Sequence, residues 1–351
     1  MNDGDIPLLR AQEVKESLQG RELELIEIVK KAYLTHADGD SVAPHSVFLR
    51  FPDASRNRVI ALPAYLGGEF QVAGLKWISS FPGNLDLGLE RASAVLILNS
   101  LVTGQPTAIM EGSIISSIRT AASAALAAQS LCHGDPNPRL GIIGCGQINF
   151  QTVRFVSAGS PQINRLVIYD LSRSRAESFK DLCRRQFEEM EVEVASNPGE
   201  VLRRCSLISI ATTAVSPHIF DLSSCRPGSV ILHLSLRDLS PQMILNGDNV
   251  VDDIDHVCRE QTSIHLAEQL AGNRNFIRCT LADVLLGKSP PRVDPPGITI
   301  FSPFGLGILD LAVGSLALKL GLSQDIGIVV SDFLPESWTD KGGKLTKTPN
   351  S

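Results

Sequence analysis

Four charged residues interrupt segments of the sequence that are otherwise apolar. Arg50 ends the run SVFLR, and Lys76 lies within AGLKWIS. Arg119 interrupts a long run of small and aliphatic residues, and Asp238 follows ILHLSLR. Because an isolated buried charge is costly, such residues are candidates for a reactive or ligand-binding site. Two arginines for carboxylates, with a lysine and an acid for proton transfer, would suit redox chemistry at the α-carbon of an amino acid.

Each of the four also has an ordinary structural explanation. Arg50 could be a solvated strand end, and Lys76 could extend its ammonium group to solvent from a strand edge. Arg119 could bind internal carbonyl groups, and Asp238 could be a turn residue. His233 is a weaker candidate for ligand contact, because it lies in the predicted strand that precedes Asp238. The residues alone leave these alternatives open.

The stretch RLGIIGCGQINF, residues 139–150, has the order strand, glycine turn, helix. Its apolar run at 140–143 predicts a strand that is buried on both faces. Gly144 and Gly146 permit a sharp turn, after which the free N–H groups of a helix that begins at Gln147 can bind a pyrophosphate. The motif therefore predicts a dinucleotide site.

The third position of this fingerprint and the end of the next strand refine the prediction. Asn149 stands where the usual motif has glycine or alanine, a position that serves mainly helix–strand packing, so phosphate binding could survive the change. Asp170 ends the predicted strand RLVIYD about 20 residues further on, where a ribose-binding carboxylate is expected. Such a carboxylate repels a 2′-phosphate and favours NAD over NADP. Arg173 and Arg175 could instead hold that phosphate.

The composition is that of a globular protein, and the length of 351 residues predicts two domains. The formal net charge is −6, so nucleic acids and anionic membranes are not expected as partners. The seven scattered cysteines form no C-x-x-C pair, which suits free thiols in a reducing cytoplasm. The histidines show no metal-binding spacing, and the sequence shows neither a signal peptide nor a bilayer-spanning run. We therefore expect a cytoplasmic protein without a metal site.

The first part of the chain predicts a mainly β unit. A first strand is expected at 6–10 and an amphipathic helix at 22–36. Further strand-like runs cover 46–50, 58–66, 70–80, 92–99 and 107–111. A long helix at 113–130 is almost purely small and aliphatic, so it should be buried between domains.

Residues 139 to about 300 alternate between strands and helices, which is the doubly wound pattern. The candidate strands are 140–143, 165–169, 191–194, 206–210, 230–235 and 249–252, with a return to strand at 298–301. We therefore expect an α/β fold, with a Rossmann dinucleotide domain at 126–304 inserted in an α+β outer domain at 1–125 and 305–335. The polar tail at 336–351 is expected to be disordered.

Several longer runs resemble the ornithine cyclodeaminase/μ-crystallin family. MEGSIISSIRTAASAALAA, GIIGCGQI and FSPFGLGILDLA carry this resemblance, which covers nearly the whole chain. The runs RVIALPAYLGGE, AGLKWISS, LERASAVLILN and AIMEGSIISSIRTAA are most similar to one branch of the family. Its members are the staphyloferrin B-type siderophore-pathway dehydrogenases that convert N-(2-amino-2-carboxyethyl)-L-glutamate to 2,3-diaminopropionate.

The resemblance implies a homodimer, formed by the outer domain, with the active site between the domains. It implies that Arg50, Lys76 and Arg119 contact the substrate and that Asp238 is the acid/base. The residues that it places at the NAD cofactor are Arg119, Thr120, Gly144, Gly146, Gln147, Ile148, Asp170, Thr212, Thr213, Leu232 and Ser235. The chain departs from the family at Asn149 and at Pro303, where the cyclodeaminases have a serine that contacts the cofactor.

This interpretation assigns a role to each charged group. Arg50, Arg91 and Arg119 would bind the three carboxylates of the substrate. Asp238 would accept the amine proton while hydride leaves for NAD, and Lys76 would assist water attack on the imine. The products would be 2-oxoglutarate and 2,3-diaminopropionate, for siderophore or other secondary-metabolite biosynthesis. An upstream enzyme that makes the substrate is an expected pathway partner.

The same charged residues and NAD site leave other functions open. A cyclodeaminase would convert ornithine or lysine to a cyclic imino acid and ammonia without net NADH. Such a substrate has one carboxylate, so Arg91 argues mildly against it. A related imino-acid reductase or amino-acid dehydrogenase, and a crystallin-like or hormone-binding protein without activity, are the remaining alternatives. Net NADH production separates the dehydrogenase from the cyclodeaminase.

Overall fold

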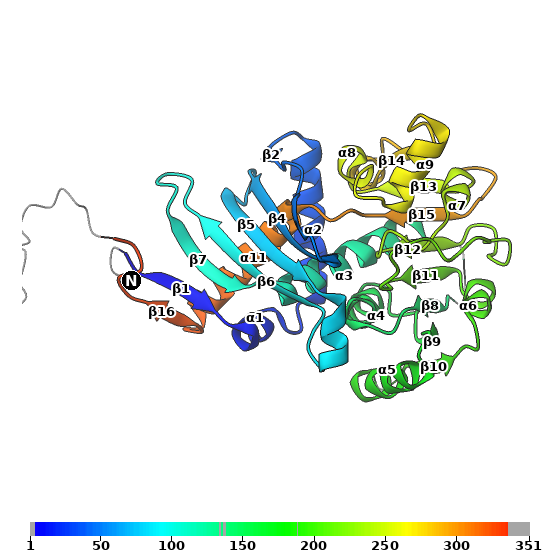
Figure 1. Cartoon of the computed structure of the whole chain (residues 1–351), viewed down its shortest axis with the longest axis horizontal. Helices are drawn as coiled ribbons and strands as arrows, with labels where there is room; N and C mark the ends of the chain where they lie inside the picture. Colours follow the sequence, from blue (N-terminus) through cyan, green and yellow to red (C-terminus); the bar gives the residue numbers. More distant parts are fainter. Residues whose placement is uncertain (1–3, 133–134, 136–137, 188, 336–351) are drawn as a thin grey trace, which may run out of the picture.

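Two eight-stranded β-sheets lie side by side in the molecule (Figure 1). The computed structural model describes residues 4–132, 135, 138–187 and 189–335. The tail at 336–351, for which disorder was expected, lies outside the described residues. None of the helices in the described part of the chain is long and apolar enough to cross a membrane.

The first sheet, called here the outer sheet, is mixed and has the strand order β16-β1-β7-β6-β5-β4-β2, with β3 paired to β4. Neighbouring strands are antiparallel except β1 and β7. Its strands agree with the predicted runs to within a few residues, except that β2 was not predicted. They are β1 (Ile6–Leu9), β2 (Ser41–Val42), β3 (Val47–Phe51), β4 (Ala54–Leu66), β5 (Val72–Ser80), β6 (Ala92–Asn99), β7 (Pro106–Glu111) and β16 (Ile328–Val330).

The second sheet is wholly parallel, with the strand order β10-β9-β8-β11-β12-β15-β13-β14. Its strands are β8 (Leu140–Ile143), β9 (Arg165–Tyr169), β10 (Glu191–Val194), β11 (Leu207–Ile210), β12 (Val230–His233), β13 (Asp248–Val251), β14 (Ile277–Thr280) and β15 (Thr299–Ser302). The predicted α/β fold with a Rossmann-type sheet is confirmed. The strand order reverses between β8 and β11, and ligands of such sheets bind at this switch point.

The sequence did not predict β14. Its four residues alternate between buried and half-buried positions, and Arg278 interrupts the apolar pattern. The Arg278 guanidinium is held by Asp248 on β13, with Nε 2.5 Å from Oδ1, so the charge is paired at the edge of the sheet.

The helices cover the faces of both sheets. They are α1 (Ala11–Leu18), α2 (Glu22–Ala37), α3 (Gly112–Leu131), α4 (Gln147–Gly159), α5 (Arg173–Gln186), α6 (Pro198–Arg204), α7 (Pro241–Leu245), α8 (Ile254–Val257), α9 (Ser263–Ala271), α10 (Leu281–Leu285) and α11 (Gly307–Ser323), with a 3₁₀ helix at Pro82–Leu87. Figure 1 shows α3 and α4 between the sheets and α6 on the far face of the parallel sheet. One hydrophobic core extends from the outer sheet through α3 to the near face of the parallel sheet, and a second lies behind that sheet.

Helix α3 joins the two sheets, as its apolar sequence predicted. Glu111 caps its first turn by accepting hydrogen bonds from the N–H groups of Ser113 and Ile114 at 2.7 and 2.9 Å. Most of its residues are buried, and it packs against α2, α4, α11 and strands of both sheets. The proposed domain boundary after residue 125 falls inside this helix. The two units thus share a continuous core.

Candidate active site

The glycine turn lies at the switch point of the parallel sheet. Gly144 has φ +94°, and a Cβ there would lie 2.3 Å from the Ala211 carbonyl oxygen, so only glycine fits. Gly146 precedes α4, whose first N–H groups donate to no capping side chain. A Cβ at Gly146 would meet nothing within 4 Å, which shows open space beside the turn. Free N–H groups and open space at a helix N-terminus suit a pyrophosphate.

Asn149 explains the departure from the usual fingerprint. Its side chain is fully buried, and Nδ2 donates to the carbonyl oxygens of Ile143 at 3.0 Å and Gly144 at 2.6 Å. Its Oδ1 accepts from Ser209 Oγ at 2.7 Å. The side chain therefore ties α4 to β8 and β11 by hydrogen bonds, where a smaller residue would rely on close packing.

Two cavities meet above this turn. The inner cavity, of about 300 Å³, is lined by α3, the start of β6, the start of α4 and the segments that follow β11, β12 and β15. The Asp170 cavity, of about 540 Å³, is lined by the glycine turn, the end of β9 and residues 211–216. The cavities share Gly146, Arg175, Ala211, Thr212 and Thr213, so they form one groove across the switch point.

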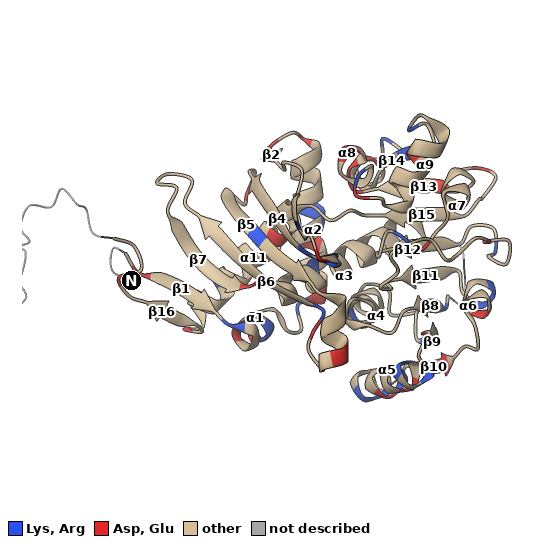
Figure 2. Cartoon of the chain, viewed as in Figure 1, with Lys and Arg blue, Asp and Glu red and all other residues tan. Residues whose placement is uncertain are grey.

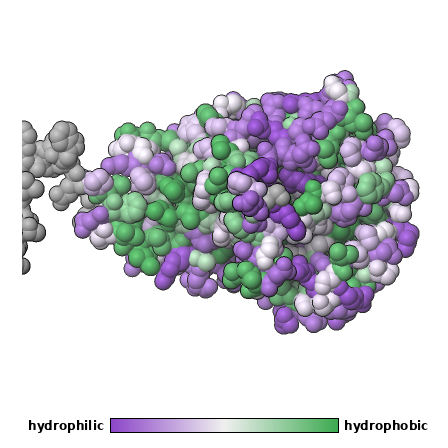
Figure 3. Space-filling model, viewed as in Figure 1, coloured by the Kyte–Doolittle hydropathy of each residue, from purple (hydrophilic) through white to green (hydrophobic). Residues whose placement is uncertain are grey.

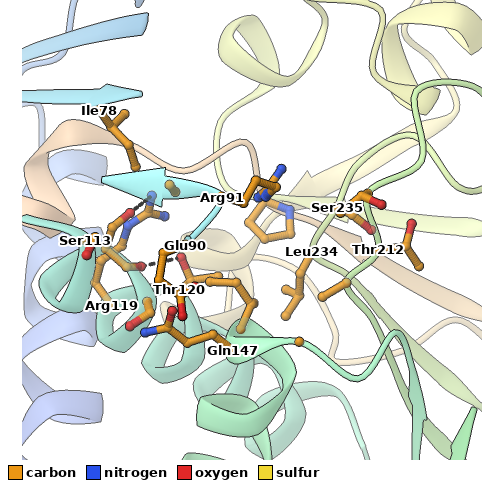
Figure 4. A pocket seen from close by; sticks show the side chains of 18 of the residues that line it. Ile78, Glu90, Arg91, Ser113, Arg119, Thr120, Gln147, Thr212, Leu234 and Ser235 are labelled. Carbon is orange, nitrogen blue, oxygen red and sulfur yellow. Dashed lines mark hydrogen bonds between the residues drawn. The ribbon is translucent and has the colours of Figure 1, made fainter. Parts of the chain in front are cut away.

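Most of the predicted site residues line this groove. The residues in the inner cavity are Arg91, Arg119, Thr120, Gly146, Gln147, Ile148, Thr212, Thr213 and Ser235. Gly144 and Asp170 line the Asp170 cavity. Figure 4 shows Arg119, Thr120 and Gln147 on one side, Thr212 and Ser235 on the other, and Arg91 between them. Pro303, the second departure from the family, also lines the inner cavity.

Four predicted site residues line neither cavity. Leu232 is buried within β12, and Asp238 is buried behind Thr212 and Ser235. Lys76 lies beneath the cavity floor with 2% of its side chain exposed. Arg50 is half exposed and pairs with Glu260. The direct substrate contacts of Arg50 and Lys76 stay predictions.

A carboxylate that the sequence interpretation missed, Asp310 on α11, binds Lys76 and Arg119. Lys76 Nζ lies 2.7 Å from Asp310 Oδ2 and 3.0 Å from Ser116 Oγ. Arg119 Nε lies 3.2 Å from Asp310 Oδ1. Figure 2 shows blue on β5, whose other residues are uncharged, beside red on α11. Asp310 is fully buried, so this one carboxylate is the shared counterion of two cations between the outer sheet, α3 and α11.

The surroundings of Lys76 bring its titration close to neutral pH. Burial and the charge of Arg119 lower the pKa of Lys76 to about 8, while Asp310 acts in the opposite direction. A lysine with such a pKa can exchange a proton near neutral pH, which a general acid or base requires.

Asp238 is the centre of a second buried network. Its carboxylate accepts hydrogen bonds from the hydroxyl groups of Thr212 and Ser235. His218 Nε2 lies 3.0 Å from Oδ1, and His233 Nε2 lies 3.3 Å from Oδ2. Burial alone would raise the pKa of Asp238, but these hydrogen bonds and the histidines lower it well below its usual range. Asp238 therefore reaches the inner cavity through the two hydroxyl groups that it orients.

His218 is a further residue that sequence reasoning missed. It lines the Asp170 cavity, and 43% of its side chain is exposed. A histidine in the loop after a Rossmann strand is a weak signal by itself, because its partner Asp238 is 20 residues away in sequence. Among the described residues, no group of three or more His, Cys, Asp or Glu side chains is arranged to hold a metal ion.

Comparison with known proteins identifies the family. The model of the ornithine cyclodeaminase/mu-crystallin family matches residues 7–317. The chain belongs to this family. A relative from Staphylococcus aureus, N-((2S)-2-amino-2-carboxyethyl)-L-glutamate dehydrogenase, is 29% identical over 312 residues, which cover 87% of this chain and 92% of the relative.

Solved structures show the same fold. The Thermococcus litoralis Δ1-pyrroline-2-carboxylate reductase, in complex with NADH and L-proline, has a TM-score of 0.86 and 25% identity, covering 93% of this chain and 100% of its own. An archaeal alanine dehydrogenase dimer with bound NAD has a TM-score of 0.83 and 26% identity, with coverages of 93% and 99%. Both structures were solved with NAD or NADH, which agrees with the predicted cofactor.

Asp170 occupies the position that the sequence interpretation gave to the ribose-binding acid. It directly follows β9, and its Oδ2 accepts from the Cys145 N–H at 2.8 Å. Its Oδ1 accepts from the Ser172 N–H at 2.9 Å, and Arg175 lines the same cavity. The carboxylate thus stabilises the glycine turn and faces the space beside it.

Substitution of Asp170 tests whether this residue selects NAD over NADP. Asp170→Ala is expected to weaken NAD binding and to raise the NADP/NAD ratio of kcat/KM by about tenfold or more, because a repulsive charge near a 2′-phosphate is removed. Steady-state kinetics with both cofactors measures this ratio. Glu191→Ala, an exposed carboxylate on β10 that pairs with Arg165, is the matched control. An unchanged cofactor preference would place the ribose acid elsewhere.

Proposed function

We propose one substrate for this NAD-dependent oxidoreductase of amino or imino acids. The substrate is N-(2-amino-2-carboxyethyl)-L-glutamate, which would be cleaved oxidatively to 2,3-diaminopropionate and 2-oxoglutarate. The balanced reaction consumes one NAD⁺ and one water and releases NADH and a proton. The similar dehydrogenase from S. aureus supports the choice, and so does the charge of the inner cavity.

Arg91 is the observation that carries this proposal. Its guanidinium lines the inner cavity together with that of Arg119. Its Nη1 donates to Ser80 Oγ at 3.5 Å, and no carboxylate among the described residues forms an ion pair with it. Burial lowers the pKa of Arg91, as expected for a cation that lacks a counterion. A substrate with three carboxylates supplies that counterion, whereas ornithine, with one carboxylate and a distal cation, does not.

Each residue of the site would have a separate role in this reaction. Arg91 and Arg119 bind carboxylates and orient the secondary amine. Asp238, through the hydroxyl groups of Thr212 and Ser235, takes the amine proton as the carbon–hydrogen bond at the glutamate α-carbon breaks. The nicotinamide, when bound, accepts that hydrogen with its electron pair. Lys76 then assists the addition of water to the C=N bond, and rupture of the carbon–nitrogen bond releases the two products.

The outer sheet supports the proposal that two copies associate. Val47, Trp77 and Val95 lie in one row across β3, β5 and β6, on the face opposite Lys76. Their exposed fractions are 65%, 44% and 41%. Figure 3 shows hydrophobic residues on the visible surface over this sheet. An exposed apolar patch favours an interface, and the archaeal relative was solved as a dimer, so we expect a homodimer formed by this sheet.

The test is absorbance at the reduced-nicotinamide band with purified protein, NAD and the conjugate. Ornithine, alanine and proline serve as comparison substrates. We expect stoichiometric NADH and 2-oxoglutarate from the conjugate alone. Ammonia and proline from ornithine, without net NADH, would establish a cyclodeaminase instead. NADH from alanine or proline only would show that the proposed cleavage is wrong.

A further inference from the structure

Four arginines gather beside the inner cavity, on the face of the outer sheet that carries Lys76. Arg50 on β3 is paired in register with Arg58 on β4, and Arg58 is paired with Ser80 on β5. Arg91 Nη1 lies 3.5 Å from Ser80 Oγ. The arginine cluster consists of these three residues and one from the parallel-sheet unit, namely Arg50, Arg58, Arg91 and Arg237.

Glu260 connects the fourth arginine to the cluster. Arg237, in the segment after β12, donates from Nη2 to the Glu260 carbonyl oxygen at 2.6 Å. The Glu260 carboxylate forms an ion pair with Arg50. Glu260 thus joins the segment after β12 to β3 of the outer sheet, and the cluster lies where the two units meet.

The cluster has more positive charge than its counterions neutralise. Among the described residues, one carboxylate, that of Glu260, forms an ion pair with it. Asp238 also acts on Arg237 electrostatically, but its oxygens are engaged by Thr212, Ser235 and the histidines. Like charges directly opposite on neighbouring strands destabilise a sheet, so Arg50 beside Arg58 is unfavourable without an anion.

Arg58 shows most clearly that the cluster lacks negatively charged partners. Its Nε is buried and has no hydrogen-bond partner in the described part of the chain. Burial and the charges of Arg237, Arg91 and Arg50 lower the pKa of Arg58 to about 10. An unsatisfied buried donor on a charged group costs stability, and a ligand oxygen that accepts from it would recover that cost.

The backbone at the cluster is also strained. Leu236, Glu260 and Gln261 have φ values of +69°, +56° and +55°. Such conformations cost free energy for residues other than glycine and are found mainly at functional sites. Here they flank Arg237 and hold Glu260 in place.

We propose that the arginine cluster binds a substrate carboxylate remote from the reacting carbon, and that Glu260 occupies this subsite in the free enzyme. Arg91 belongs to both the cluster and the inner cavity, so one ligand can extend from the cavity into the cluster. The subsite selects amino acids that carry two or more carboxylates. It rests on the proposed function only in that the ligand is taken to be the substrate.

Binding of simple carboxylates tests the subsite without turnover. Isothermal titration of the NADH-saturated enzyme compares glutarate with valerate, which has the same number of carbons and one carboxylate. We expect glutarate to bind more tightly than valerate. Arg58→Gln should weaken glutarate binding by about tenfold or more and leave valerate unchanged, since charge-assisted hydrogen bonds are lost. Arg204→Gln, a partly buried arginine paired with glutamates on the far face, is the matched control.

Glu260→Gln should change the affinity for glutarate in the opposite direction to Arg58→Gln. It removes the internal competitor, so glutarate should bind more tightly than to the unaltered enzyme. A merely structural ion pair predicts weaker binding instead, and this variant decides the question if Arg58→Gln does not fold. Equal affinity for glutarate and valerate, or tighter binding of inorganic phosphate than of glutarate, would also overturn the proposal.

The two proposals fail separately. If glutarate binding follows the predicted pattern but the conjugate yields no NADH, the subsite stands and the substrate assignment falls. If the conjugate yields NADH but Arg58→Gln leaves its KM unchanged, the reaction stands and the subsite falls.

Discussion

Replacement of Asp238 by asparagine should lower kcat by about 10²–10⁴-fold, the usual contribution of a positioned proton-transfer group. The amide has nearly the shape of the carboxylate but no charge, and its NH₂ group cannot accept hydrogen bonds. Thr212 or Ser235 would lose its acceptor, and His218 would lose the anion that lies 3.0 Å from its Nε2. The proton of the substrate amine would then have no route to a buried base. Single-turnover kinetics of NADH formation measures this loss.

NAD binding separates a chemical effect from a folding effect in this variant. Titration with NADH should give a dissociation constant close to that of the unaltered enzyme, because the glycine turn and Asp170 are untouched. Asp221→Asn is the matched control, since Asp221 also accepts from a serine hydroxyl and a backbone N–H but lies at the surface. Normal turnover in Asp238→Asn would remove Asp238 from the mechanism.

The parallel sheet could be predicted from the sequence because its signals are local. Strands β8, β9, β11 and β12 are short apolar runs buried on both faces, and each is followed by turn residues. The sequence signal of the glycine turn is likewise local, because Gly144, which has a positive φ, and Gly146, which has open space beside it, lie two residues apart. For the same reason, Asp170 was found at the end of its strand. The role of Asn149 was not predicted, because its partner Ser209 belongs to a distant strand.

The charged part of the site could be predicted only in part. Unpaired charge in an apolar segment identified Lys76 and Arg119, but the same rule applied to GILDLAVGSLALKL would have identified Asp310. The pairing itself joins residues 234 positions apart and depends on how α11 returns to the outer sheet. Arg58 and Arg237 gave no signal of this kind, because they lie next to polar residues in the chain. Only the register of β3, β4 and β5 brings the cluster together.

Asp310→Asn should produce the largest loss of stability, about 3–5 kcal/mol, because removal of one partner leaves buried cations uncompensated. Lys76 has 2% and Arg119 11% of its side chain exposed, so water cannot replace the carboxylate. The pKa of Lys76, about 8 in the folded enzyme, should fall further, since Asp310 is the group that raises it. Urea unfolding monitored at several pH values measures the free energy of unfolding.

The sign of the pH dependence follows from this pKa. The folded-state pKa of Lys76 lies below its unfolded value, so its protonation opposes folding at low pH, and stability rises as pH passes from the folded toward the unfolded pKa. In Asp310→Asn the pKa of Lys76 is lower, so stability begins to rise at a lower pH than in the unaltered enzyme. The difference in the free energy of unfolding between the two should therefore shrink as pH approaches about 8. The double variant Lys76→Met, Asp310→Asn should regain much of the lost stability, because one unpaired charge is gone. A deficit that is small and independent of pH would show that Asp310 is not the counterion of Lys76.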